Sequence, residues 1–280
     1  MIPFLHLGPL TIPTFGLMVA CAMLAAFFVL RADLERRGLA SSGKKDASNS
    51  AGAASPKSAN AEAELLIAIP CMVGLAGAKL YHLLESPSDF FAHPLALLIS
   101  PYGFAWFGGL LAGFAAFVWV GRRQRIPLFT LLDTGSPAAA LGYGIGRIGC
   151  FLSGDGDYGI PTSLPWGMSF PNGLVPTTQR VHPTPIYELI VACAIAWFLW
   201  RMFDRQRSAL RNNPLPAGSV FAAYLVLTGL ARFLVEFIRI NPHSFLGMSN
   251  AQAASLASFI AGIILWWWLA KSFTRRRNLA

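Results

Sequence analysis

The sequence predicts an all-α membrane protein with seven transmembrane helices, and three observations support this fold class. Of its 280 residues, 55% are hydrophobic and only 12% are charged, about half the charged share of an average soluble domain. Seven separate apolar stretches approach or exceed the ~20 residues that a helix needs to cross a bilayer. The basic residues gather after alternate stretches. This composition excludes an ordinary soluble enzyme and a disordered chain.

The predicted spans follow one another along a single transmembrane domain, residues 1–280. They cover residues 11–30, 63–84, 104–120, 127–152, 183–203, 218–239 and 252–270. Residues 31–62 are a low-complexity segment rich in Ala, Ser and Lys, so we expect a flexible cytoplasmic loop. Residues 153–182 are rich in Gly, Pro, Asp and Thr, and we expect them to form a loop on the outer face. No fixed-period repeat of the kind found in many transporters is visible.

Charge predicts the orientation. Most of the 22 Lys and Arg residues follow spans one, three, five and seven. Cytoplasmic loops carry this excess, so the N-terminus should lie outside and the C-terminus in the cytoplasm. The net charge of +9 is then explained without a nucleic-acid partner. Five basic residues fall in the outer half of spans or on the outer face, namely Lys79, Arg147, Arg180, Arg232 and Arg239.

Placing a charged side chain at the centre of a membrane helix costs a free energy of ~2.5 kcal/mol or more, so such residues are retained when they have a partner. For Lys79 and Arg180, the partner that we favour is either the lipid headgroups of the outer side or an acidic residue in an internal ion pair. Arg147 lies between glycines in GIGRIG, so its guanidinium is unshielded and suits a pair of phosphate oxygens. The GxGxxG match of this segment lacks the preceding strand that a dinucleotide site needs, and we discard it.

Two further segments carry polar groups toward the outer side. After span four, Ser153, Asp155 and Asp157 form either a polar turn or a site for a metal or a base. The segment VHPTPIYE (181–188) opens span five. In it, His182 is either a base or structural, and Glu188 is expected to pair with an arginine.

Span six ends with an Arg–Glu–Arg ladder. Arg232 and Glu236 are four residues apart and Arg239 lies three further on, so they share a helix face. The ladder is either structural or the lining of a polar cavity. Together with Arg147 it predicts a strongly cationic site on the outer side, whose ligand would be an anionic phospholipid.

These segments together resemble the bacterial phosphatidylglycerol–prolipoprotein diacylglyceryl transferase family, in a divergent branch. The resemblance covers nearly the whole chain except residues 31–62. Its motifs are FGLM (15–18), GGLLAG (108–113), Asp133, Pro137, GRIG (146–149), GDGDYG (154–159), HPTPIYE (182–188) and RFLVEFIR (232–239). Any one motif is weak, but their combination, order and spacing are highly specific.

The resemblance implies transfer of a diacylglyceryl group from phosphatidylglycerol to the lipobox cysteine of a lipoprotein precursor. A thioether forms and glycerol phosphate leaves, without a cofactor. The implied partners are phosphatidylglycerol and the signal peptides of lipoprotein precursors. The implied location is the bacterial cytoplasmic (inner) membrane, with the active site facing its outer side. In the family the arginine matching Arg147 binds phosphatidylglycerol, and the residues matching Arg232, Glu236 and Gly159 belong to the functional set.

The motifs and the resemblance together give the predicted site, without a metal. The predicted catalytic residues are Arg147, Asp155, His182, Arg232 and Glu236. The predicted substrate-binding residues are Arg147, Ser153, Gly159, Tyr187, Glu188, Arg239, Gly108 and Gly109. Cys150 is a conceivable nucleophile, although we favour the interpretation that it is a small buried residue without a chemical role.

The chain departs from the family pattern at three positions, with Phe107 for a histidine, Cys150 for an asparagine and Phe15 for a tyrosine. The segment GDGDYG is also one residue longer than the commoner form. Phe107 cannot take a proton, so another base is needed. Glu236 ranks first, with Asp155, Asp157 and His182 as substitutes. Two other functions remain open, a lipid-binding family member without transfer activity and a transporter of an anionic lipid or solute.

Overall fold

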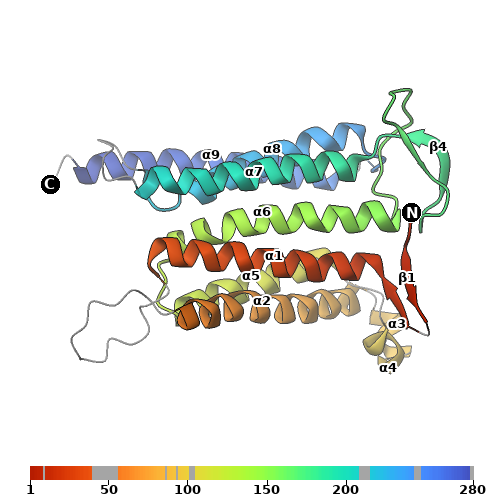
Figure 1. Ribbon diagram of the computed structural model, residues 1–280, viewed down its shortest axis with the longest axis horizontal. Helices are drawn as coiled ribbons and strands as arrows, with labels where there is room; N and C mark the ends of the chain where they lie inside the picture. Colours follow the sequence, from red (N-terminus) through yellow and green to blue (C-terminus); the bar gives the residue numbers. More distant parts are fainter. Residues whose placement is uncertain are drawn as a thin grey trace. The chain divides into compact units, whose positions relative to one another are not determined.

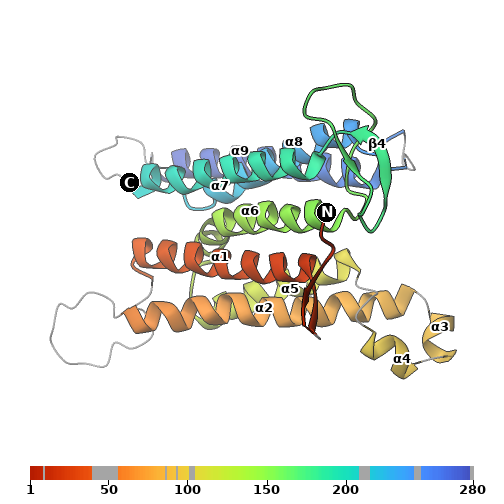
Figure 2. The same cartoon turned by 45° about the vertical axis from the view of Figure 1, so that its right-hand side comes forward.

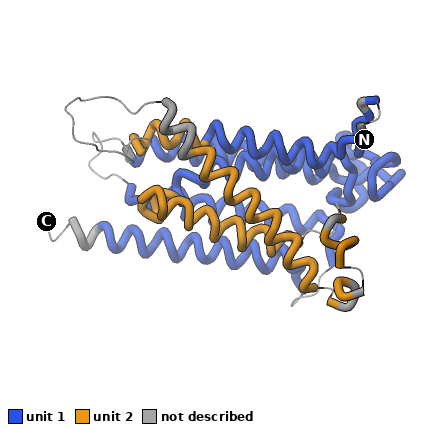
Figure 3. Tube along the Cα trace, turned by 90° about the horizontal axis from the view of Figure 1, so that it is seen from below, with its two compact units in different colours: residues 1–29, 132–280 blue, residues 30–131 orange. Residues whose placement is uncertain are grey.

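A computed structural model describes residues 1–8, 10–39, 56–85, 87–92, 94–100, 105–207, 215–242 and 247–277. The chain divides into two compact units, which Figure 3 colours separately. Unit 1 holds residues 1–29 and 132–280, and unit 2 holds residues 30–131. Each unit is described by itself.

Unit 1 is built on helices. These are the first part of α1 (Thr14–Arg37), most of α6 (Leu128–Ser153), α7 (Thr184–Arg207), α8 (Ser219–Val235) with the 3-10 turn η1 (Glu236–Ile238), and α9 (Asn250–Arg277). Helix α8 packs against both α7 and α9, and the three run side by side in Figures 1 and 2. A buried apolar cluster from α6, α7 and α8 includes Ala140, Leu199 and Val220.

Asp133 of α6 fixes the start of α8. Its carboxylate accepts the backbone N–H of Gly218 at 2.7 Å and of Phe221 at 2.8 Å. The first N–H groups of a helix have no partner within the helix, so this buried carboxylate caps them. This contact gives Asp133, one of the motif residues, a structural role as the cap of α8.

Two short antiparallel hairpins accompany the helices of unit 1. The first pairs β1 (Phe4–Leu7) with β2 (Leu10–Pro13), and the second pairs β3 (Met168–Phe170) with β4 (Thr177–Val181). The second lies within the segment 153–182 that the sequence assigned to a loop, near the start of α7 (Figure 1). An isolated bridge between Gly159 and Arg239 ties this segment to the end of η1.

Unit 2 consists of α2 (Pro56–Glu85), α3 (Pro87–Ala92), α4 (Pro94–Ile99) and α5 (Trp106–Arg123), with the last turns of α1 and the first residues of α6. Helices α2 and α5 lie side by side (Figure 2). They approach closely through a "glycine interface" made of Gly74, Gly77, Gly108, Gly109 and Gly113. Small residues allow this approach between membrane helices. Lys79 of α2 donates to the carbonyl of Ser100 at 2.8 Å, which supplies its polar partner.

The helical membrane class is confirmed, because five helices are long and apolar enough to cross a bilayer. They are Thr14–Arg37, Ala63–Glu85, Thr184–Asp204, Ser219–Ile238 and Asn250–Phe273. Many large apolar side chains on them are exposed, for example Leu24, Trp197 and Ile264. The predicted spans three and four correspond to α5 and α6, which are helical but not among these five.

The predicted boundaries are wrong at three places. Residues 31–37 and 56–62 were assigned to the cytoplasmic loop but belong to α1 and α2. In α1, the ion pair of Arg31 with Glu35 at 3.0 Å and that of Arg37 with Asp33 at 2.6 Å support the last turns. The rest of that predicted loop, residues 40–55, lies outside the described residues. Residues 11–13 form a strand, so the first helix begins at Thr14.

Candidate active site

Six ionised side chains of unit 1 form a "charged cluster". They come from α6, the loop after it, α7, α8, η1 and the residue that follows η1. Its members are Arg147, Asp157, Glu188, Arg232, Glu236 and Arg239. The cluster joins residues far apart in the sequence because α8 packs on α7 and a bridge ties Gly159, in the loop after α6, to Arg239.

Glu188 lies at the centre of the charged cluster. Its buried carboxylate is 2.7 Å from Nη1 of Arg232, 3.5 Å from Nε of Arg147 and 3.4 Å from Nη1 of Arg239. The hydroxyl of Tyr143 donates to it at 2.5 Å. The predicted pairing of Glu188 with an arginine is therefore confirmed, with three arginines in place of one.

Asp157 bridges two of these arginines. One carboxylate oxygen accepts from Arg147 and the other from Arg239. Burial raises the pKa of Asp157, but the bonds from the two arginines outweigh it, so that its pKa is lowered. The loop is held by Thr184, whose hydroxyl donates to the Asp157 carbonyl at 2.5 Å.

The loop around Asp155 and Asp157 needs its glycines. Gly154 has φ +58° and Gly156 has φ +93°, in the left-handed region that glycine adopts without strain. Asp155 accepts the backbone N–H of Asp157 at 3.2 Å. Burial, together with the neighbouring charge of Asp157, raises the pKa of Asp155 above its ordinary value. The two carboxylates therefore differ, because Asp157 loses its proton more readily than Asp155.

Glu236 closes the other side of the charged cluster. It is 1% exposed and lies 3.1 Å from Nη2 of Arg232 and 3.7 Å from Nε of Arg239. Ser249 donates to it at 2.8 Å, and Asn241 donates to the same oxygen. The Arg–Glu–Arg ladder is confirmed, and it gains two polar partners from the segment leading into α9.

The prediction of a strongly cationic site is wrong. The three arginines of the charged cluster are matched by three carboxylates. The sequence argument counted the arginines toward a ligand, but a buried charge without a partner is too costly. In the described structure the acidic side chains supply that partner.

Arg147 also lines an apolar groove between α6 and α7. The groove has a volume of about 240 Å³, and its other walls are Ile148, Phe151, Pro185, Ile186 and Leu189. The guanidinium carbon lies 4.8 Å from the ring centroid of Tyr143, one turn earlier in α6. A cation at the wall of an apolar groove suits a ligand with a phosphate and a hydrocarbon chain.

Gly159 is required by close packing. A Cβ at this position would meet the carbonyl of Ile238, and would lie 2.9 Å from Cβ of His182 and 3.0 Å from Cγ2 of Thr184. Its own N–H donates to the His182 carbonyl at 2.8 Å. The predicted substrate-binding glycine thus holds the loop of Asp157 against η1.

The other predicted residues of unit 1 have different surroundings. Ser153 is buried, and its hydroxyl donates to the Cys150 carbonyl at 3.2 Å. Nδ1 of His182 lies 3.2 Å from the hydroxyl of Tyr187, which accepts from the indole of Trp166 at 2.7 Å. These bonds hold the loop between α6 and α7 against the start of α7.

Gly108 and Gly109 lie in unit 2, within the glycine interface. A Cβ on Gly108 would meet the carbonyl of Gly77 and Cβ of Tyr81, and one on Gly109 would lie 3.3 Å from Cβ of Ala78. This packing explains both glycines, and their substrate-binding role stays a prediction.

Three polar side chains that bond the carboxylates of the charged cluster were not predicted from the sequence, namely Tyr143, Asn241 and Ser249. Tyr143 precedes Arg147 by four residues and so shares its helix face, a signal that the sequence contained. Asn241 and Ser249 lie outside regular helix, and no spacing rule relates them to Glu236.

The donor atoms of Cys150, Asp155 and Asp157 lie within 4.8 Å of one another. Nη1 of Arg147 lies 3.6 Å from Sγ of Cys150 and also bonds Asp157. A metal ion in this position would have to displace that guanidinium, so the donor set does not fit a metal site.

The fold and the site define a helical membrane protein whose charged cluster adjoins an apolar groove. The family model of prolipoprotein diacylglyceryl transferase matches residues 3–268, and the chain belongs to this family. A phosphatidylglycerol–prolipoprotein diacylglyceryl transferase of Geobacter sulfurreducens is 32% identical over 94% of this chain and 92% of its own length. Enzymes of the same name from Bordetella avium and Clostridium tetani are each 30% identical, over 97% and 90% of this chain and 96% and 90% of their own lengths.

Proposed function

We propose that this protein transfers the diacylglyceryl group of phosphatidylglycerol to the lipobox cysteine of lipoprotein precursors. The observation that carries the proposal is Arg147, which joins the charged cluster to an apolar groove. A phospholipid would place its phosphate at the arginines and an acyl chain in the groove. Family membership favours a transferase over a transporter.

The proposed topology has seven spans, with α5 and α6 as the third and fourth. The N-terminus lies outside the cytoplasmic membrane and the C-terminus in the cytoplasm. The end of α6, the start of α7 and the end of α8 then face the outer side, with the charged cluster among them. The support is the excess of basic residues after alternate spans. The outer side is also where a secreted precursor presents its cysteine.

Asp157 holds the place of the substrate phosphate in this proposal. Its two oxygens bridge Arg147 and Arg239 as a phosphate would. Asp157 is 29% exposed at its side chain, and its loop contains two glycines with left-handed backbone, Gly154 and Gly156. A phosphate entering from the groove would displace this carboxylate, while Glu188 and Glu236 keep the arginines oriented.

The reaction forms a carbon–sulfur bond and breaks a carbon–oxygen bond. The cysteine sulfur attacks the carbon of the diacylglyceryl group that bears the phosphate, and the headgroup glycerol phosphate leaves with the bonding electrons. Arg147 and Arg232 stabilise the charge that develops on the leaving group. The thiol proton must pass to a base, because a thiol is mostly protonated at neutral pH.

Asp155 is the base that the geometry favours. Glu236, first in the sequence ranking, already pairs with Arg232 and Arg239 and accepts from Ser249 and Asn241. Its role is then to orient the arginines. Asp155 has a raised pKa and lies beside Cys150 and Asp157, so its carboxylate gains a proton more readily than that of Asp157.

A mass-shift assay tests the function. The protein is reconstituted in phosphatidylglycerol liposomes with a lipobox peptide, and the peptide cysteine should gain the mass of a diacylglyceryl group. The same peptide with serine in place of cysteine is the control. Folded protein that yields no product with any anionic phospholipid would overturn the proposal in favour of a lipid-binding protein. Loss of lipid from one leaflet without product would indicate a transporter.

A further inference from the structure

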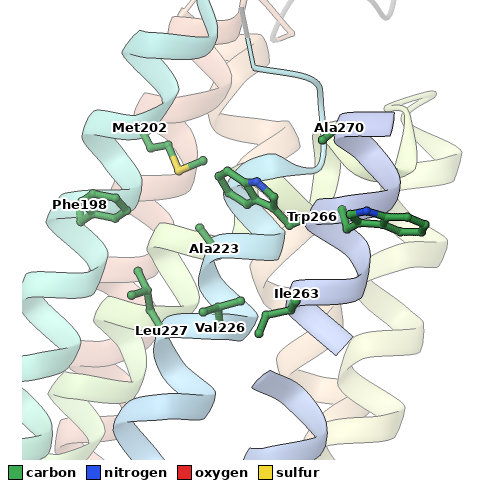
Figure 4. A pocket seen from close by; sticks show the side chains of 9 residues that line it. Phe198, Met202, Ala223, Val226, Leu227, Ile263, Trp266 and Ala270 are labelled. Carbon is green, nitrogen blue, oxygen red and sulfur yellow. The ribbon is translucent and has the colours of Figure 1, made fainter. Parts of the chain in front are cut away.

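A second apolar groove lies in unit 1 at the other end of α7, α8 and α9. It has a volume of about 470 Å³, within the range of small-molecule pockets. Figure 4 shows its side chains converging from the three helices. They are Phe198, Met202, Ala223, Val226, Leu227, Ile263, Trp266, Trp267 and Ala270. All of these lining side chains are aliphatic or aromatic, so the groove suits an occupant that offers hydrocarbon.

Two basic side chains, Lys271 and Arg201, belong to the helices that line this groove and lie close in sequence to its lining residues, at the level where these helices should leave the bilayer. Nζ of Lys271 lies 5.0 Å from the ring centroid of Trp267, which is part of the groove wall. The guanidinium of Arg201 stacks at 5.5 Å on Trp197, and Arg201 lies between the lining residues Phe198 and Met202. Tryptophan and a cation together are typical of the membrane–water interface.

The groove and its rim fit one class of ligand. An apolar channel beside two cations complements a molecule with a hydrocarbon chain and an anionic head. The zwitterionic head of a neutral phospholipid would gain nothing net from these cations. A purely apolar protein helix would fill the channel but would bring no negative charge to these cations.

We infer that this groove is a binding site for an anionic phospholipid of the cytoplasmic leaflet, separate from the substrate site. An acyl chain occupies the channel among Trp266, Ala223 and Phe198, and the phosphate lies near Lys271 and Arg201. The inference rests on the proposed orientation, in which the C-terminal ends of α7 and α9 face the cytoplasm. Its occupant is a bound lipid and not a reactant.

The test is native mass spectrometry of delipidated full-length protein, titrated separately with phosphatidylglycerol and phosphatidylcholine. Wild-type protein should bind two phosphatidylglycerol molecules, one at each site. Lys271→Gln with Arg201→Gln should weaken one of the two about fivefold per charge removed. Arg147→Ala should weaken the other. Ala270→Trp should block the groove, because Ala270 is an exposed lining residue whose larger side chain fills the channel.

Arg123→Gln is the matched control. Arg123 stacks at 5.1 Å on Trp119 of α5 with the same four-residue spacing, but α5 contributes no lining residue to the groove, whereas α7 contributes two. It should leave both binding events unchanged. Gel filtration and circular dichroism establish whether each variant is folded. If Ala270→Trp does not fold, the charge variants Lys271→Gln and Arg201→Gln alone test the lipid site.

Three results would overturn the inference. Equal retention of phosphatidylcholine would show ordinary bilayer contact. An equal effect of Arg123→Gln would show a general charge effect. If a cysteine introduced at a lining residue of the groove cross-linked to a helix of another protein, the groove would be a protein interface. The mass-shift assay separates this site from the proposed function, since Lys271→Gln should leave transfer to the lipobox peptide intact even where lipid retention is lost.

Discussion

The charged cluster of unit 1 and the glycine interface of unit 2 are both buried contacts between helices, held in opposite ways. The charged cluster uses long side chains whose charges cancel around Glu188 and Glu236. The glycine interface removes side chains so that the backbones of α2 and α5 approach. Changes in the first should therefore affect chemistry and stability together, whereas changes in the second should affect stability alone.

The largest effect is expected from Glu236→Gln. The side chain is 0% exposed and neutralises Arg232 and Arg239, so its loss leaves buried cations uncompensated. Breaking a buried ion pair in this way costs about 3–5 kcal/mol. Thermal unfolding in detergent should show this loss, together with a fall in transferase activity.

Glu35→Gln is the matched control for that variant. The Arg31–Glu35 pair has the same four-residue spacing at 3.0 Å, but its glutamate is 43% exposed. Exposed helix pairs contribute about 0.3–0.5 kcal/mol, so this variant should unfold at nearly the wild-type temperature. Similar losses for both variants would show that burial of Glu236 is unimportant.

Arg147→Lys should have the next largest effect, on rate. Lysine keeps the charge but cannot bond Asp157 and Glu188 with one planar fork as Arg147 does. Loss of one preorganised donor at a developing charge costs about 10²–10³ in rate. The mass-shift assay measures this, with Arg31→Lys as the control. Full activity of Arg147→Lys would remove this residue from the phosphate site.

The sequence predicted the members of the charged cluster better than their arrangement. Spacing along one helix was enough to relate Arg232, Glu236 and Arg239, because helix geometry is local. The bridging by Asp157 depends on a loop that folds back onto η1, and no pattern in the sequence specifies that closure. The motif set raised Gly108 and Gly159 as functional residues, but a motif cannot distinguish substrate contact from a position without room for a Cβ.

Each of the seven predicted spans corresponds to a helix, and five of these helices are long and apolar enough to cross a bilayer, because hydrophobic length is a strong signal. The two short hairpins were missed, since their strands have at most five residues. The ends of α1 and α2 were also missed. Their sequences are polar there, and ion pairs such as Arg37 with Asp33 support a helix that hydropathy does not detect.

Asp155→Asn should remove the acid limb of the pH–rate profile. The base acts when ionised, and the pKa of Asp155 is raised above its ordinary value of 3.8, so wild-type activity should fall as the pH drops through that raised pKa. Asp157, with its lowered pKa, stays ionised over the same range. The variant should lose about 10²-fold in rate, and its remaining activity should not follow this limb. An unchanged limb would assign the base to another residue, and His182→Gln would then be the next variant to measure.

Gly108→Val should have the smallest effect, and on stability alone. The Cβ of the new valine would meet the carbonyl of Gly77 and Cβ of Tyr81. Because the carbonyl belongs to the backbone, this clash can be relieved only if α5 moves away from α2. Overpacking of this kind costs about 1–3 kcal/mol. The control is Gly16→Ala in α1, where a Cβ meets nothing within 4 Å and alanine favours the helix. If Gly108 only packs, the folded fraction of the variant keeps the wild-type KM for phosphatidylglycerol while its unfolding temperature falls. A raised KM at unchanged stability would restore the substrate-binding role that the motif predicted and would end the division between the two regions.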